Sequence, residues 1–218
     1  MTKLLFIEAS PRGGASASTH AARHFLDALQ SRHLGLAIDH LDLWKEALPE
    51  FDGAALAAKY ARLAKREHHG DEADAWRKIT AMVGRIASAD AVVIATPMWN
   101  FGIPYKLKHW IDLITQPGLS FSFDPQKGYT PLLTPRPTLV IVASSGDYSA
   151  GASFGRPDLA TPYLNATLRF LGLGEPTFLG IGPAAGPVEA VDAARAAAER
   201  RLTAIAAEFV PVAAQVRS

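Results

Sequence analysis

Serine, threonine, alanine and glycine dominate residues 8–19 (EASPRGGASAST), which separate an apolar run at residues 3–7 from a helical pattern starting near His20. The first N–H groups of a helix are unpaired and the helix dipole is positive there, so a helix N-terminus attracts phosphate. The stretch contains neither GxGxxG nor GxxxxGK(S/T), which disfavours a dinucleotide fingerprint and a Walker A site. It therefore suits a monophosphate held by amides and hydroxyls alone, unless Ser18 or Thr19 merely caps the helix.

Aromatic and amide side chains occupy a second loop, residues 96–104, directly after the apolar run at residues 91–95. Trp99 and Phe101 suit stacking around a flat heterocycle whose polar edge the Asn100 amide reads, although both rings can instead pack beneath the loop. A flat heterocycle that carries a monophosphate is typical of flavin mononucleotide (FMN).

A third loop, residues 143–149, follows the apolar run at residues 138–143. Gly146 lets the backbone approach a ligand closely, and Tyr148 offers a hydroxyl donor. This loop alone is equally compatible with a plain turn. Three such loops at equivalent places, after three strands, argue for one shared ligand site.

The elements expected to position these loops alternate between strand and helix. Near-continuous β-branched runs predict strands that are covered on both faces. They lie at residues 3–7, 91–95 and 138–143, with weaker candidates at 36–41 and 176–181, and helical patterns lie at residues 21–29, 106–114 and 191–209. The alternation predicts an α/β fold with a parallel sheet and helices on both sides.

One connection, residues 44–89, is longer than a single crossover helix requires. It has room for two helices, at residues 53–65 and 72–86. It is either an ordinary insertion or a helical excursion used in a dimer contact or as a wall of the ligand site. The proline-rich stretch 129–137 interrupts helix formation and is expected to be an ordered loop leading into the fourth strand.

Composition bounds the functional class. The chain has 218 residues, of which 49% are hydrophobic and 20% charged, so residues 1–218 are expected to form a single domain with a sizeable core. A net charge of +1 gives no basic field for nucleic acid. The chain has no cysteine, and its seven histidines lack a metal-ligand spacing, so no metal site is expected. Without a signal peptide or a membrane-spanning run, the expectation is a cytoplasmic protein without a membrane partner.

Two short motifs are similar to functional signatures without meeting their requirements. Residues 180–186 look like a dinucleotide loop, but the glycine spacing is wrong and the motif follows the last predicted strand, so we expect a connection into the final helix. Residues 144–146 do not form a GxSxG elbow, which disfavours a hydrolase.

The motif E-A-S-P-R-x-x-x-S-x-S at residues 8–18, followed by T-P-M-W-N-F-G-I-P-Y-x-L-K-x-W-I-D at residues 96–112, resembles the flavin-dependent NADH-azoreductase/quinone-reductase family. Residues 118–123 and 170–172 also fit, so the resemblance covers essentially the whole chain. It implies a flavodoxin-like three-layer sandwich with a five-stranded parallel sheet in the order 2-1-3-4-5. It also implies a homodimer in which the second subunit completes each site, and residues 44–89 are our expectation for part of the contact.

The resemblance assigns roles to residues of all three loops. It implies that the FMN phosphate and ribityl chain are bound by Ser10, Ser16, Ala17 and Ser18. The isoalloxazine ring would be bordered by Met98, Trp99, Asn100 and Phe101, and its far edge contacted by Ser144, Ser145, Gly146 and Asp147. Apart from the resemblance, we expect the acceptor to enter a pocket walled by Trp99, Phe101, Phe121 and Phe123. Asn100 and Tyr148 are our candidates for polar assistance to catalysis.

The third loop departs from the family pattern. Residues 144–147 read Ser-Ser-Gly-Asp, where the family has Thr/Ser-Arg-Gly-Gly. The missing arginine removes a cation that can help a bound ligand. If Asp147 faced the ring, it would disfavour an anionic reduced flavin, whereas a solvent-facing Asp147 would change little.

The predicted function is therefore ping-pong transfer of two electrons from NADH or NADPH, through FMN, to a quinone or an azo compound. Two alternatives are a flavin-binding electron carrier or sensor without significant turnover, and a hydrolase or nucleotide-binding module that uses the first loop for another phosphate.

Overall fold

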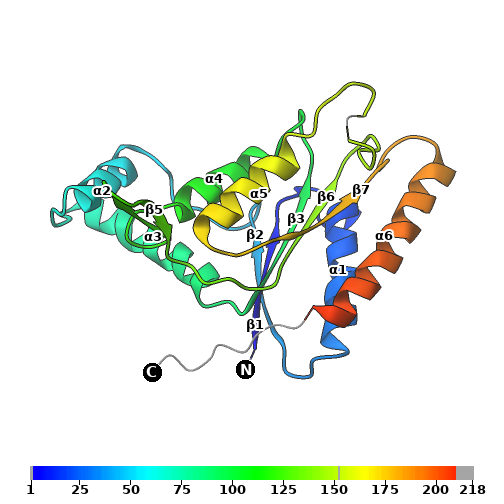
Figure 1. Ribbon diagram of the computed structural model, residues 1–218, viewed down its shortest axis with the longest axis horizontal. Helices are drawn as coiled ribbons and strands as arrows, with labels where there is room; N and C mark the ends of the chain where they lie inside the picture. The colour runs from blue at the N-terminus through cyan, green and yellow to red at the C-terminus, as the bar shows by residue number, and fades with distance from the viewer. Residues whose placement is uncertain (1, 152, 210–218) are drawn as a thin grey trace.

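Five parallel strands form the central sheet of the computed structural model, which describes residues 2–151 and 153–209 (Figure 1). In spatial order they are β2 (Ala37–Asp42), β1 (Lys3–Glu8), β3 (Ala91–Pro97), β6 (Thr138–Ala143) and β7 (Thr177–Ile181). This is the predicted arrangement of five strands. The numbers differ only because a separate hairpin, β4 (Phe121–Asp124) with β5 (Gly128–Pro131), precedes the fourth strand of the sheet.

Alternating side chains of the strands pack into two separate cores. Leu5, Ile7, Val92 and Ile94 face one side of the sheet, and their chain neighbours Leu4, Phe6, Ala91 and Val93 face the other. Successive residues of a strand point to opposite faces, so apolar runs without alternation are covered on both sides. The sheet therefore lies between two helical layers, as predicted.

The helices divide between the two faces of the sheet (Figure 1). One face is covered by α1 (Ala17–Gln30) and α6 (Val188–Glu208), which lie side by side. The other is covered by α3 (Asp71–Ala87), α4 (Tyr105–Ile114) and α5 (Ala160–Leu171), and α2 (Gly53–Leu63) packs against α3. A 3-10 turn, η1 (Gly13–Ala15), directly precedes α1.

The long connection between β2 and β3 holds the two predicted helices, α2 and α3. Asp52 caps α2 by accepting a hydrogen bond from Ala55 N at 3.1 Å, and three acidic residues in the first turn of α3 complement its dipole. The connection therefore consists of two helices close to the predicted bounds.

Two sequence expectations were wrong. The stretch 129–137 is not a loop throughout, because its first residues form β5 of the hairpin. The first helix begins at Ala17 rather than near His20, one turn closer to the first loop. Helix α5 was not predicted at all.

No described helix is long and apolar enough to cross a membrane. Within residues 2–151 and 153–209, no group of three or more His, Cys, Asp or Glu side chains is arranged to hold a metal ion.

Candidate functional site

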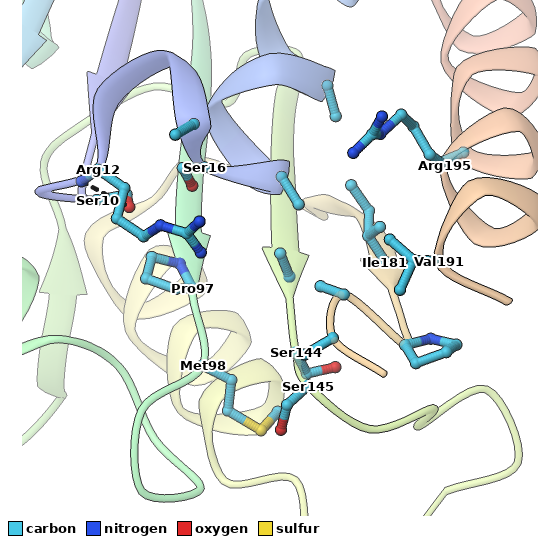
Figure 2. A pocket seen from close by; sticks show the side chains of 18 of the residues that line it. Ser10, Arg12, Ser16, Pro97, Met98, Ser144, Ser145, Ile181, Val191 and Arg195 are labelled. Atoms are coloured by element: carbon cyan, nitrogen blue, oxygen red, sulfur yellow. Dashed lines mark hydrogen bonds between the residues drawn. The ribbon is translucent and has the colours of Figure 1, made fainter. Parts of the chain in front are cut away.

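A cavity of about 320 Å³ lies at the carboxyl ends of the central strands (Figure 2). Its walls come from the loops after β1, β3, β6 and β7 and from one face of α6. Strand β2 lies on one side of β1, and the later strands are added on the other side, starting with β3. Open α/β sheets bind ligands at such a switch point, here between β1 and β3. The three loops singled out in the sequence thus contribute to one site.

The N-terminus of α1 opens toward this cavity without a side-chain cap. The Ser16 hydroxyl at the N-cap position lies 3.0 Å from Ser18 Oγ and bonds to no N–H group of the first turn. Ser16 and Ala17 line the cavity, Ser18 is buried behind them, and the first turn holds no acidic residue. Unpaired N–H groups and the positive end of the dipole favour an anion there.

A buried carboxylate anchors the loop from beneath. Glu8 ends β1 and is 1% exposed. Its Oε1 accepts a hydrogen bond from Thr19 Oγ1 at 3.2 Å, while its Oε2 lies 3.0 Å from His40 Nε2 and 3.7 Å from Arg23 Nη2. A buried charge persists only when it is paired and hydrogen-bonded. Glu8 therefore ties the first turns of α1 to strands β1 and β2.

The second loop is a tight turn with residues in unusual backbone conformations. Trp99 and Gly102 exchange N–H to carbonyl hydrogen bonds, both at 2.9 Å, around Asn100 at φ +48° and Phe101 at φ +72°. Positive φ at both central residues is typical of a type I′ turn, which asparagine tolerates and phenylalanine rarely adopts. Such strain is retained where the surrounding structure requires it, often at functional sites.

Trp44, which sequence reasoning missed, holds this loop against β1. Its indole Nε1 donates to the carbonyl oxygen of Ala9 at 3.0 Å. Its ring centroid lies 5.8 Å from that of Trp99, which lines the cavity, and 5.4 Å from that of Tyr105. Trp44 follows the carboxyl end of β2, so the rule that selected the other loops pointed here as well.

The third loop is hydrogen-bonded to the end of β7 and to the residues that follow it. Ser144 N donates to Ile181 O at 2.9 Å, and Ala184 N donates to Ser144 O at 2.8 Å. A side chain at Gly146 would collide with Ser153, and one at Gly182 would collide with the carbonyl oxygen of Gly146. Gly182 therefore needs glycine for its close approach to the backbone of Gly146, whereas a Cβ at Gly146 would meet side-chain atoms only.

Asp147, the acidic residue that departs from the family pattern, is exposed and lies outside the cavity lining. The exposed Asp147 accepts a hydrogen bond from Ser149 N at 2.8 Å, and this donor lowers the pKa of the carboxyl below its usual range. Asp147 is not among the residues that line the cavity.

The cavity wall formed by residues 183–185 and α6 was not predicted from the sequence. Residues 183–185, from the segment set aside as a false dinucleotide loop, line the cavity, although that segment does connect β7 to α6 as predicted. Val191, Arg195 and Ala198 of α6 complete the wall, and Arg12 enters from the first loop. Arg12 belongs to the first-loop motif and could have been selected from the sequence. Arg195 could not, because its place in the cavity wall depends on how α6 packs against α1.

The structure brings seven of the predicted site residues to the cavity and leaves the others off its lining. The seven are Ser10, Ser16, Ala17, Met98, Trp99, Ser144 and Ser145. Those off the lining are Ser18, Asn100, Phe101, Gly146, Asp147, Tyr148 and the hairpin residues Phe121 and Phe123. Of these, Ser18, Asn100 and Gly146 are direct chain neighbours of lining residues. Phe121 is buried against Tyr129 and Phe170, with ring centroids 5.7 and 5.3 Å away, and Phe123 is 53% exposed.

Comparison with known proteins places these features in context. Residues 2–205 match the Flavodoxin_2 family, described as having a flavodoxin-like fold. A relative from Bradyrhizobium diazoefficiens named FMN-dependent NADH:quinone oxidoreductase 1 is 48% identical over 209 residues, which cover 96% of this chain and 100% of the relative. A Ruegeria pomeroyi FMN-dependent NADH:quinone oxidoreductase is 45% identical over 185 residues, covering 84% of this chain and 90% of that protein.

Solved structures show the same fold. An FMN-dependent NADH-azoreductase from Bacillus anthracis str. Ames Ancestor, in complex with FMN, superposes with a TM-score of 0.80 at 26% identity, covering 94% of this chain and 100% of that chain. An azoreductase from Bacillus anthracis str. Sterne superposes with a TM-score of 0.86 at 24% identity, covering 96% of this chain and 100% of that chain.

Proposed function

The chain belongs to the family with a flavodoxin-like fold that matches residues 2–205, and on this premise we propose that it is an FMN-dependent oxidoreductase that carries two electrons from NADH to a quinone or an azo compound. The relatives named above are FMN-dependent NADH:quinone oxidoreductases, and the structural neighbour that shares 26% of its sequence is an azoreductase in complex with FMN. The observation that carries the proposal is the meeting of three loops, after β1, β3 and β6, in one cavity.

The residues present fit FMN. A monophosphate would be held by the uncapped N-terminus of α1 and the hydroxyls of Ser10 and Ser16, where the described lining contains no carboxylate to oppose it. A flat ring would lie between Met98 and Trp99 on one side and Ser144 and Ser145 on the other. Backbone N–H groups of these loops would face its polar edge.

When bound, FMN supplies the redox chemistry, accepting a hydride from NADH and passing two electrons to the acceptor. The protein's own part is to bind, orient and exclude water. Trp44 holds Trp99 in place, and the hydrogen bond from Met98 N to Ala143 O, at 2.7 Å, fixes the second and third loops relative to each other. The family resemblance implies that donor and acceptor stack on the same flavin face in turn, so we expect ping-pong kinetics.

We predict that Asn100→Gly lowers kcat/KM for the quinone about tenfold and leaves FMN affinity nearly unchanged, because only the amide is lost. Glycine adopts the φ of +48° found at Asn100 without strain, whereas alanine would add about 1 kcal/mol of strain and confuse the result. Steady-state kinetics and an FMN titration measure the two effects. Unchanged kinetics would remove Asn100 from the site.

The activity is tested by an anaerobic titration. The purified protein is saturated with FMN, freed of excess, and mixed with NADH and then with a quinone. Bleaching of the visible flavin absorption by NADH and its recovery with the quinone would support the oxidoreductase. Bound flavin that does not bleach would indicate a carrier or sensor, and absence of bound flavin would overturn the proposal.

The acceptor pocket is proposed to need a second copy of the chain. The hairpin β4–β5, which carries Phe121 and Phe123, packs on α5 and lies near α2, away from the loops after β6 and β7 that help to wall the cavity (Figure 1). Neither ring lines that cavity. In a homodimer, the hairpin of one subunit would wall the cavity of the other, with α2 and α3 forming part of the contact.

Co-expression of two defective variants tests this arrangement. Ala17→Asp is expected to block FMN binding, and Phe123→Ala, at an exposed position, to lower quinone reduction about tenfold. If the hairpin acts on the other subunit, the mixed dimer contains one intact site and recovers activity. If it acts on its own cavity, each subunit remains defective, and the mixture stays no more active than Phe123→Ala alone.

A further inference from the structure

Two arginines are the only charged side chains among the described residues that line the cavity. Arg12 enters from the loop after β1, and Arg195 enters from α6, on the opposite wall (Figure 2). The other described lining residues are hydroxyl-bearing or apolar. Two positive charges in one concave site, whose described lining holds no carboxylate, favour a polyvalent anion.

Arg12 is free to bind such an anion. Its exposed side chain forms no ion pair with any residue in the described ranges, and only its backbone N–H bonds within the loop, to Ser10 Oγ at 3.4 Å. Figure 2 shows its guanidinium between Ser16 and Pro97, below the start of α1. The group therefore lies near the hydroxyls and the helix N-terminus expected to hold a phosphate.

Arg195 is the one polar residue of an otherwise apolar stripe. Val191, Arg195 and Ala198 are spaced four and three residues apart, so they share one face of α6, and all three line the cavity. The side chain is 53% exposed, and its ion-pair partner is Asp192 on the same helix, at 3.8 Å. A pair this exposed holds the guanidinium weakly, so an anion in the cavity can take its place.

We propose that Arg12 and Arg195 form a two-armed clamp for the phosphate monoester of the cofactor and make the protein prefer FMN over riboflavin. This inference rests on the proposed function and deepens it. A phosphate monoester carries a charge of about −1.5 to −2 at pH 7, which two guanidinium groups neutralise, and guanidinium forks match phosphate oxygens geometrically. The first loop thus uses more than the amides and hydroxyls expected from sequence.

The test compares FMN with riboflavin, which lacks only the phosphate. Dissociation constants are measured by quenching of flavin fluorescence in the full chain for the wild type, Arg12→Gln, Arg195→Gln and the control Arg200→Gln, whose exposed side chain on α6 is off the cavity lining. Each clamp variant is expected to weaken FMN about tenfold and to change riboflavin affinity less than twofold. The control should match the wild type, and the FMN preference should shrink as salt rises.

If Arg12→Gln or Arg195→Gln keeps the wild-type ratio of FMN affinity to riboflavin affinity, the proposed clamp is wrong. An Arg195→Gln protein with an unchanged ratio but a raised KM for NADH would also overturn the clamp, because the arginine would then read the donor. Failure of the proposed function is distinguishable, since it appears as wild-type protein that binds neither flavin, or that binds FMN but is not bleached by NADH. In the second case the clamp can still be confirmed from the affinities alone.

Discussion

Gly182→Ala is expected to lower the free energy of unfolding by about 3 kcal/mol and to abolish tight FMN binding. The new methyl group would collide with the carbonyl oxygen of Gly146 and meet Ser144 Oγ at 3.1 Å. Neither neighbour can yield easily, because the loop after β6 is fixed on both sides of the collision. Ser144 bonds to Ile181 and to Ala184, at 2.9 and 2.8 Å. Urea unfolding and an FMN titration measure the two effects.

The chain provides a matched control two residues away. Gly180 lies in β7, which ends one residue before Gly182, and a Cβ at Gly180 would have no neighbour within 4 Å. Gly180→Ala is therefore expected to change stability by less than about 0.5 kcal/mol and to leave FMN affinity intact. If Gly182→Ala unfolds at the wild-type urea midpoint, the close contact between the loops after β6 and β7 does not contribute to stability in solution.

The sheet was predictable because its strands are covered on both faces. Residues 3–7, 91–95 and 138–143 show near-continuous apolar runs that no exposed strand needs, and each became β1, β3 or β6 with at most two added residues. The hairpin β4–β5 escaped notice because each of its strands has four residues and mostly exposed side chains. Helix α5 was not predicted because Pro162 argued against a helix there. Pro162 lies in the first turn of α5, where proline is tolerated.

The part of the candidate site that comes from loops directly after predicted strands could be predicted from the sequence. The loops after β1, β3 and β6 converge because the carboxyl ends of parallel strands share one edge of the sheet. Arg195 and residues 183–185 come from the end of the chain, and their place in the cavity is set by the packing of α6 against α1. The spacing of residues in the sequence does not predict how α6 packs against α1, so this wall of the cavity could not be predicted.

Ala17→Asp is expected to have opposite effects on stability and on cofactor binding. Ala17 is the first residue of α1 and lines the cavity. An acidic residue in a first turn without one complements the helix dipole, so the free energy of unfolding without FMN should rise by about 0.3–1 kcal/mol. The same carboxylate would oppose the cofactor phosphate. At about 5 Å and an effective dielectric of about 20, each unit of like charge costs about 3 kcal/mol, so FMN affinity should fall about a hundredfold or more.

Ala17→Asn separates charge from size, because asparagine has nearly the shape of aspartate without its charge. If the phosphate lies at the N-terminus of α1, Ala17→Asn should bind FMN within about fivefold of the wild type while Ala17→Asp does not, and riboflavin should distinguish the two variants far less. Equal loss of FMN affinity in both variants would mean that bulk rather than charge is excluded at Ala17. Equal retention would place the phosphate elsewhere in the cavity. A gain in stability together with a loss of FMN affinity in Ala17→Asp would mean that the dipole of α1 is uncompensated when no ligand is bound. This agrees with the Ser16 hydroxyl, which lies 3.0 Å from Ser18 Oγ and does not cap α1.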